Sequence, residues 1–153
     1  MKKLIIALTL MASASLVGCA GQPSKAYDGA ARDIRELSVF KATARFTSGS
    51  AQITIFDGRG DTFGRPYRPL TNQNEIHALP GRHTMTVRVS DSARMGEYNG
   101  WEKISIDSEA GRTYLVHGEL EVLQFNPPKG RVLVWITIEG SDRVVAGTPP
   151  AQK

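Results

Sequence analysis

The stretch Thr113-Tyr114-Leu115-Val116-His117-Gly118-Glu119-Leu120-Glu121-Val122 alternates between two kinds of residue along its whole length. One parity is apolar except for its glycine, and the other parity is mainly polar. A period of two is the period of a β-strand, whose successive side chains point to opposite faces of a sheet. The stretch therefore predicts a long strand with one face on a hydrophobic core and the other face toward water.

The same alternation recurs on both sides of this stretch, interrupted by Gly, Pro, Asn or Asp at intervals of about 8 to 15 residues. In 83–89, for example, His83 shares the apolar face with Met85, Val87 and Val89. Residues 29–41 are harder to interpret, because a spacing typical of two helical turns precedes a β-rich run, and we expect a short helical or irregular segment there. The expected strands lie around residues 38–44, 53–55, 83–89, 104–107, 114–122, 132–138 and 143–146, with Ile53 and Ile55 on one face and 139–142 as a turn.

So many short strands, with little helix, predict an all-β protein, and a single antiparallel β-sandwich of six to eight strands is the expected architecture. The turn residues agree with this prediction. Pro80-Gly81 suits a type II turn in which Gly81 takes a positive φ, and Ala110-Gly111 can play the same part before the next strand.

The amino terminus has the layout of a secretory signal. Met1-Lys2-Lys3 is positively charged, and residues 4–17 are mostly apolar. A helix that crosses a bilayer needs about 20 apolar residues, so this shorter run predicts a cleaved signal rather than a permanent span.

The run ends in Leu16-Val17-Gly18-Cys19, which contains the only cysteine of the chain. This ending resembles the lipobox of bacterial lipoproteins at every position. The resemblance implies cleavage before Cys19, attachment of diacylglycerol to its thiol and acylation of the new amino group. Two or more acyl chains form a stable membrane anchor. Residue 20 is Ala rather than Asp, which by the same resemblance implies export to the outer membrane, facing the periplasm, with surface exposure left open. An ordinary signal peptide cleaved after Ala14 or Ala20 is the alternative.

The expected organisation is a signal peptide at 1–18, a lipidated tether at 19–26, a β-sandwich domain at 27–147 and a flexible tail at 148–153. Loss of Lys2 and Lys3 with the signal reduces the formal net charge of +4 by two, so the charge indicates no nucleic-acid partner. With Cys19 lipidated, no disulfide can form within the chain, and a hydrophobic core must stabilise the domain.

A second resemblance covers roughly residues 52–123. The motif Leu79-Pro80-Gly81-Arg82-His83-Thr84-Met85-Thr86-Val87, followed later by Glu109-Ala110-Gly111-Arg112-Thr113-Tyr114, is similar to the pattern of small PEGA-like, prealbumin-type sandwich domains of envelope lipoproteins. That class has no common catalytic residues, so the resemblance implies fold alone. A longer insertion after Asp57-Gly58 departs from the usual short hairpin of these domains.

The sequence offers little for catalysis. It has no Gly-x-Ser-x-Gly elbow, and its only thiol is committed to lipid. The histidines His77, His83 and His117 lack a common face, and we expect His83 to be a partly buried, hydrogen-bonded core residue. The segment 57–61 lacks the oxygen ligands of a calcium loop, and its Arg-Gly-Asp triplet is common by chance in Gly-rich turns. We therefore expect no enzyme activity, no cofactor and no metal.

A binding surface is the remaining candidate. The segment 57–74 is longer than most connections in a compact domain, and such loops are usually functional or disordered. Together with 91–101 it carries aromatic and arginine side chains, the types that are enriched at binding hot spots. The candidate partner surface comprises Arg59, Phe63, Arg65, Tyr67, Arg68, Tyr98 and Trp101, with Trp135 as a further outward aromatic. A solubilising loop is the alternative interpretation.

Three functions are compatible with these features. The first is a non-catalytic envelope lipoprotein that binds a protein or glycan partner. The second is a structural or stress-related lipoprotein without a specific partner, and the third is a peptidoglycan- or carbohydrate-binding accessory of a hydrolase.

Overall fold

The computed structural model describes residues 23–45, 49–60, 74–91, 98–125 and 128–151. Within these ranges the chain forms eleven β-strands and one 3₁₀ helix, and no helix is long and apolar enough to cross a bilayer. The elements are β1 (Ser24–Lys25), η1 (Ile34–Glu36), β2 (Ser38–Ala42), β3 (Ala44–Arg45), β4 (Gly49–Phe56), β5 (Arg59–Gly60), β6 (Glu75–Ala78), β7 (Gly81–Asp91), β8 (Tyr98–Ser108), β9 (Thr113–Phe125), β10 (Pro128–Ile138) and β11 (Val144–Gly147).

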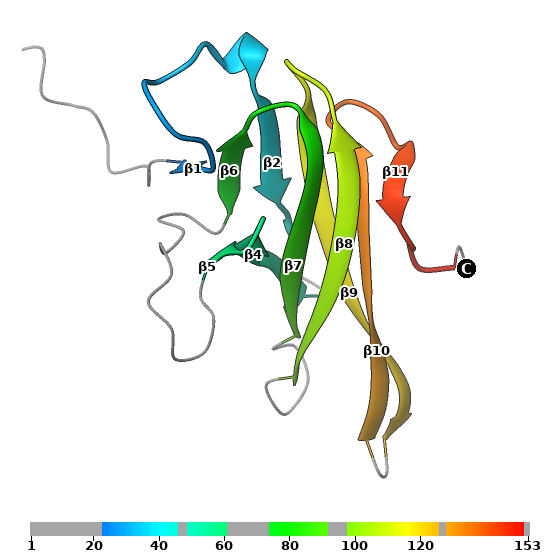
Figure 1. Cartoon of the computed structure of the whole chain (residues 1–153). Coiled ribbons are helices and arrows are strands. Elements are labelled where there is room, and N and C mark those ends of the chain that lie inside the picture. The colour runs from blue at the N-terminus through cyan, green and yellow to red at the C-terminus, as the bar shows by residue number, and fades with distance from the viewer. Residues whose placement is uncertain (1–22, 46–48, 61–73, 92–97, 126–127, 152–153) are drawn as a thin grey trace, which may run out of the picture.

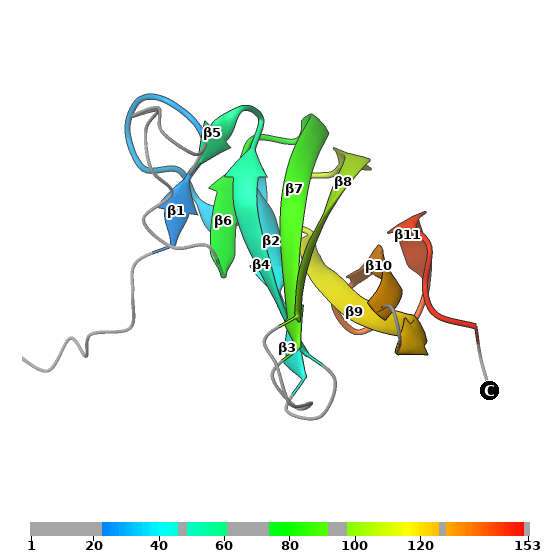
Figure 2. The same ribbon diagram turned by 90° about the horizontal axis from the view of Figure 1, so that it is seen from below.

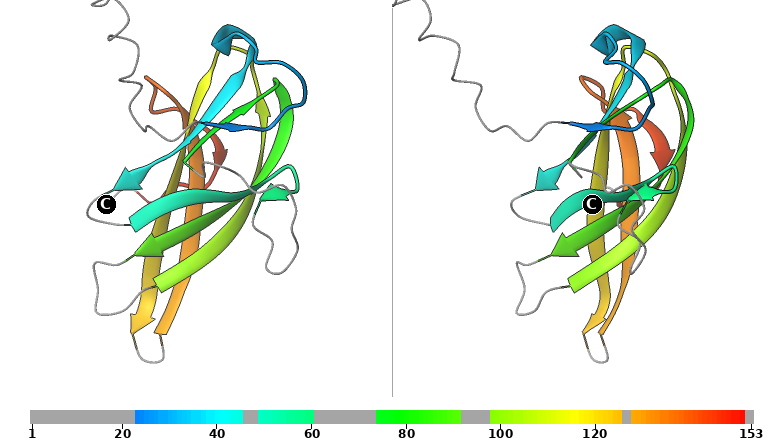
Figure 3. Two further views of the ribbon diagram at one scale, coloured as in Figure 1. Left: turned by 90° about the vertical axis from the view of Figure 1, so that its left-hand side faces the viewer. Right: turned by 60° about the vertical axis from the view of Figure 1, so that its left-hand side comes forward.

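The strands form two sheets that pack face to face, which confirms the predicted all-β sandwich (Figures 1 and 3). The larger sheet has the order β1-β6-β2-β9-β10-β11, and the smaller has the order β3-β4-β7-β8, with β5 paired to β4. Seen from below, β1 and β11 lie at opposite edges of the larger sheet (Figure 2). The predicted strand near 38–44 is divided at Thr43, where the chain passes from β2 in one sheet to β3 in the other.

The observed sandwich differs from the expected antiparallel sandwich of six to eight strands in two details, the direction of two strand pairs and the number of strands. The pairs β1–β6 and β2–β9 are parallel. Alternation of residue types shows which face of a strand is buried, but not whether the neighbouring strand runs parallel or antiparallel to it. In the sequence, all strands of the smaller sheet lie between β2 and β9, so no short hairpin sets their direction. The strand count rises to eleven because β1, β3 and β5 have two residues each, too few to show a period.

Alternation fails in β4 because of a β-bulge. The register with β7 shifts between Ile53 and Ile55, which pair with Val87 and Thr86. Ile53 and Phe56 are therefore fully buried, whereas Ile55 is only half-buried. The predicted common face of Ile53 and Ile55 is thus wrong, since one extra residue in a strand turns the following side chains to the other face.

Asp57 and Gly58 form the tight turn between β4 and β5, with φ of 48° and 74°. Positive φ at both central residues is typical of a type I′ hairpin turn. The predicted positive φ of Gly81 and Gly111 is also confirmed, at 139° and 70°.

The core lies between the sheets and is centred on Phe40 of β2, which is fully buried. Its ring stacks on Tyr114 with centroids 5.2 Å apart and contacts Phe56 at 5.1 Å. The remaining buried apolar side chains extend this cluster along both inner faces: Ala51, Ile53, Ile76, Ala78, Met85, Val87, Val89, Ile104, Ile106, Val116, Val134 and Ile136.

The 3₁₀ helix η1 begins at an N-cap that carries the clearest electrostatic signature in the described residues. The side chain of Arg35 donates two hydrogen bonds to the Asp33 carboxylate, and the backbone N–H of Arg35 donates a third. The side-chain hydrogen bonds are the largest cause that holds the pKa of Asp33 below its ordinary value, and the backbone hydrogen bond is the second. The same side-chain hydrogen bonds raise the pKa of Arg35.

Substitution Arg35→Ala is expected to bring the pKa of Asp33 back toward its ordinary value, because the largest cause of its depression is removed. In the unchanged protein, the contribution of Asp33 to stability is present above the pKa of the unfolded chain and is lost as pH falls through the lower, folded pKa. An NMR titration of the Asp33 carboxyl carbon measures its pKa in both proteins, and denaturant unfolding at several pH values measures the effect on stability. An unchanged midpoint in the variant would exclude Arg35 as the cause.

Candidate functional site

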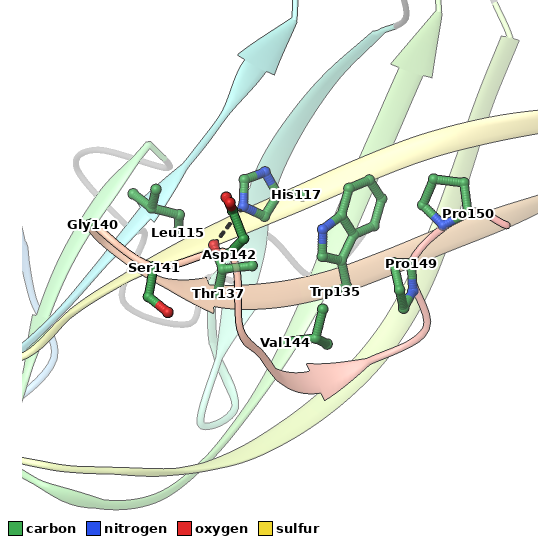
Figure 4. Close-up of a pocket in the computed structure, with 10 residues that line it drawn as sticks. All are labelled: Leu115, His117, Trp135, Thr137, Gly140, Ser141, Asp142, Val144, Pro149 and Pro150. Atoms are coloured by element: carbon green, nitrogen blue, oxygen red, sulfur yellow. Dashed lines mark hydrogen bonds between the residues drawn. The ribbon is translucent and has the colours of Figure 1, made fainter. Parts of the chain in front are cut away.

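A pocket of about 520 Å³ lies on the outer face of the larger sheet, between β9, β10 and the chain that follows β10 (Figure 4). Its floor is formed by Leu115 and His117 of β9 and by Trp135 and Thr137 of β10. These four residues have the parity opposite to the core residues Val116, Val134 and Ile136, so their side chains leave the sandwich on its outer side. The volume is within the roughly 300–1,000 Å³ range of small-molecule sites.

The chain after β10 builds the rim. Residues 139–143 connect β10 to β11, which pairs antiparallel with β10, and this confirms the predicted turn and last strand. From this segment Gly140, Ser141 and Asp142 line the pocket, followed by Val144, Pro149 and Pro150. Figure 4 shows these residues around the His117 and Trp135 rings. The rim is thus held against the floor by the pairing of β11 with β10.

The floor is held rigid by an aromatic stack and two hydroxyl contacts. The rings of His117 and Trp135 are nearly parallel, 15° apart, with centroids separated by 5.2 Å. The Nε2 of His117 lies 2.9 Å from the Thr137 hydroxyl, and its Nδ1 lies 3.1 Å from the Thr43 hydroxyl. Trp135 is only 6% exposed. The two rings are therefore held in fixed positions, with His117 half-buried and Trp135 almost fully covered.

The rim depends on a close crossing at Gly147, the last residue of β11. Its φ is 81°, and a Cβ there would lie 2.1 Å from the carbonyl oxygen of Val134. The next residue, Thr148, donates its N–H to that same carbonyl at 3.0 Å. Thr148 thus belongs to the folded domain, although we expected the frayed tail to begin there.

Substitution Gly147→Ala is expected to detach β11 from β10 and to lower the free energy of unfolding by about 1–3 kcal/mol, from backbone strain alone. The added methyl also meets backbone atoms, which cannot move away as a side chain would. Denaturant unfolding measures the loss, and a red shift of tryptophan emission reports exposure of Trp135.

The matched control is Gly140→Ala, at a φ of 80° with no atom within 4 Å of the added Cβ. This variant has similar backbone strain without the clash, so its loss of stability should be smaller and the emission unchanged. Equal behaviour of the two variants would mean that the crossing at Gly147 has no special role.

The histidines are separated by the fold. His77 lies in β6 with its Nε2 2.8 Å from Glu75, His83 points into the core, and His117 is in the pocket floor. Among the described residues, no group of three or more His, Cys, Asp or Glu side chains is arranged to hold a metal ion.

His83 is buried and hydrogen-bonded, as predicted from its place on the apolar face of its strand. Its Nδ1 lies 2.6 Å from the Asp57 carboxylate and its Nε2 lies 2.7 Å from the carbonyl oxygen of Leu79. Asp57 also accepts from the backbone N–H of Thr84, at 2.8 Å. The group therefore fastens the turn at 57–58 to β7.

The predicted partner surface is only partly within the described residues. Phe63, Arg65, Tyr67 and Arg68 lie outside them, and Tyr98 is described only as backbone at the start of β8. Arg59 lies in β5 with its guanidinium 3.7 Å from Asp28, and Trp101 lies in β8, 49% exposed. The strands β4 and β7 separate β5 from β8, so Arg59 and Trp101 are not neighbours.

The proposal that Trp135 extends this surface is wrong. Trp101 has the parity opposite to the core residues Ile104 and Ile106, so it lies on the outer face of the smaller sheet. Trp135 lies on the outer face of the larger sheet, and it is buried by the rim of the pocket. An aromatic residue at an outward parity is buried when a later segment of chain folds over the sheet, and no local pattern in this chain indicates that segment.

The pocket is the site that sequence reasoning missed. Trp135 was the one signal, because a large aromatic on an otherwise polar parity marks a covered part of a sheet face.

No protein-family model, curated protein or solved structure matches this chain.

Proposed function

We propose that this chain is a lipid-anchored, non-catalytic binding module of the bacterial cell envelope, held at the periplasmic face of the outer membrane through Cys19. The support for the anchor is the sequence Leu16-Val17-Gly18-Cys19 at the end of an export signal, together with the absence of any other cysteine. The pocket supports a binding role over a purely structural one.

One observation carries the proposal: the folded domain begins almost directly after Cys19. Ser24 is only 2% exposed and pairs with Ile76 as the first residue of β1, and the backbone N–H of Ala26 donates to the carbonyl oxygen of His77 at 2.8 Å. Ser24 to Ala26, which the sequence assigns to the tether, are thus hydrogen-bonded to the larger sheet in the described part of the chain. The remaining tether, from Cys19 to Ser24, spans at most about 18 Å when fully extended.

With Cys19 acylated, such a short tether would keep the domain close to the bilayer surface. An acyl-modified Cys19 would hold the β1 edge of the larger sheet close to the headgroups and leave the opposite edge directed into the periplasm. The non-catalytic part of the proposal is supported by the histidines, whose ring nitrogens make structural hydrogen bonds in the described part of the chain.

Substitution Cys19→Ser tests the anchor. We expect the variant to move from the membrane fraction to the soluble or unprocessed fraction, because a serine hydroxyl does not accept the diacylglycerol and the acyl chains supply the membrane affinity. Fractionation followed by immunoblotting measures the distribution. Ser24→Ala, which leaves the thiol in place, is the control and should stay in the membrane. A Cys19→Ser protein that remains in the membrane at its mature size would contradict the proposal.

A further inference from the structure

Strand β8 ends the smaller sheet with an edge to which no described strand is paired (Figure 2). Along its other edge it pairs with β7 over its whole length of 11 residues, without a bulge. The remaining edge strands of the described chain are short, because β1, β3 and β5 have two residues each and β11 has four. A long edge strand is a template for another strand, and short edges are one way in which proteins avoid such pairing.

The hydrogen bonds of β7 show which backbone groups of β8 point to the unpaired edge. The N–H of Thr84 donates to the Asp57 carboxylate, and the carbonyl oxygen of Thr84 accepts from the Asp57 N–H, so both groups point away from β8. Thr84 lies opposite Ser105, and opposite residues of an antiparallel pair either bond to each other or both point away. The N–H and C=O of Ser105 therefore point to the unpaired edge, as do those of Lys103 and Asp107, two residues to either side.

This edge is open to a partner. Lys103, Ser105 and Asp107 are exposed, and in the described part of the chain no backbone hydrogen bond joins β8 to the larger sheet. A groove of about 270 Å³ runs beside the edge, between residues 102–104 of β8 and a wall formed by residues 131–134 and 147–148. The larger sheet thus lies beside β8 without pairing with it.

The outward face of β8 is complementary in charge to a second copy of itself. Lys103 and Asp107 lie four residues apart on this face, and neither belongs to an ion pair within the described residues. An antiparallel copy with Ser105 opposite Ser105 places Lys103 of each copy opposite Asp107 of the other. The same register places Ile104 opposite Ile106 on the inner face. Opposite charges and β-branched side chains that lie directly across an antiparallel pair stabilise it.

Other registers lose this match. A slide of two residues in either direction separates Lys103 from Asp107, and a slide of four places Lys103 opposite Lys103 or Asp107 opposite Asp107. A slide of one residue sets outward side chains against inward ones. Charge and parity therefore select the register centred on Ser105.

We infer that β8 pairs antiparallel with β8 of a second copy of this chain, about a two-fold axis at Ser105. Lys103, Ser105 and Asp107 exchange backbone hydrogen bonds with the partner, and the two smaller sheets become one continuous sheet. A two-fold axis uses the same surface of both copies, which is why a strand that matches itself in charge is suited to it. The pairing gives the domain a partner that does not depend on the pocket or on the anchor.

Cysteine cross-linking in cells that express the full chain tests the register. In the inferred pair the two Cα atoms at position 105 are about 5.5 Å apart, within the range that a disulfide bridges. Ser105→Cys is therefore expected to give a covalent dimer on oxidation, measured on a non-reducing gel. Trp101→Cys, on the same exposed face, is the matched control. Its two copies would lie roughly 27 Å apart, so no dimer should form.

Charge reversal tests the ion pairs. In the Ser105→Cys chain, either Lys103→Glu or Asp107→Lys alone is expected to slow cross-linking about tenfold, because like charges then face each other at two places in the dimer. Both reversals together restore opposite charges and should restore the rate. Asp142→Lys, the same change of charge on an exposed turn of the larger sheet, is the control and should leave the rate unchanged. Thermal unfolding of each variant verifies that it is folded.

Three outcomes would overturn the inference: no cross-link at residue 105, a cross-link at residue 101 that forms as fast as the one at 105, or a double reversal that stays as slow as the single ones. The unchanged chain, whose one cysteine is Cys19, measures the background. A covalent dimer of the unchanged chain would reveal a free Cys19 thiol and contradict the proposed anchor rather than the pairing of β8.

Discussion

Substitution Phe40→Ala is expected to lower the free energy of unfolding by about 3–5 kcal/mol, the usual loss for a phenylalanine truncated in a core. Phe40 is fully buried and contacts the rings of Tyr114, Phe56 and His83, with centroids 5.1 to 5.6 Å away. The cavity would open at the one place where β2, β4, β7 and β9 all contribute an aromatic ring, so neighbouring side chains cannot easily fill it.

Urea unfolding, followed by circular dichroism, measures this loss. The control is Ile34→Ala in η1, where the side chain is 51% exposed and the change should remain within about 0.5 kcal/mol. A loss at Phe40 no larger than the loss at Ile34 would show that the aromatic cluster is not the centre of the core.

Substitution Gly118→Val is expected to lower the free energy of unfolding by about 3 kcal/mol, near the upper end of the range for overpacked cores. Gly118 lies on the inner parity of β9, opposite Val89 and Ala51 of the smaller sheet. A Cβ there would lie 2.5 Å from a methyl carbon of Val89 and 3.3 Å from the Cβ of Ala51, before the two further methyl groups of valine are added. Relief requires the sheets to separate.

The control is Glu119→Val, one residue further along β9 and on the outer face of the sheet, where the side chain is half-buried. Valine favours strands, so this variant should lose little stability. Urea unfolding compares the stability lost in the two variants. Equal losses would mean that the packing of the other sheet against Gly118 does not exclude a larger side chain there.

Much of this fold follows from the period of the sequence. In β7, the side chains of His83, Met85, Val87 and Val89 are all buried on one face, as their alternation predicts. The turns follow from the conformational freedom of glycine at Gly81 and Gly111. These features are local, because each is determined by a few residues that are close together in the sequence.

Other features depend on residues far apart and had no local signal. The parallel pairing of β2 with β9 joins Phe40 to Tyr114 across most of the domain. The bulge at Ile53 and Ile55 is a property of the pairing between β4 and β7, which are far apart in the sequence. In both cases the period of one strand is compatible with several arrangements, and packing between the sheets selects one.

The candidate site was the least accessible to sequence reasoning. Its floor uses the outward parity of β9 and β10, which alternation assigns to water, and its rim uses Pro149 and Pro150, which resemble a tail. What connects them is the antiparallel return of β11 along β10 and the close crossing at Gly147. The role of Gly147 can be recognised only when the neighbouring backbone that it crosses is known.

The anchor proposed at Cys19, together with the pocket, would give the domain a defined orientation relative to the membrane. The chain enters at β1 with at most about 18 Å of tether after Cys19, and the pocket lies at the far edge beside β11. A module of this kind would keep its binding pocket on the side of the domain that faces away from the membrane.

The most direct test is the intact mass of the protein isolated from the membrane fraction of a bacterium that expresses the full chain. We expect a chain that begins at Cys19 and carries the added mass of a diacylglycerol and an amide-linked acyl chain. A mature protein without lipid, beginning at residue 15 or 21 after an ordinary signal cleavage, would contradict the account.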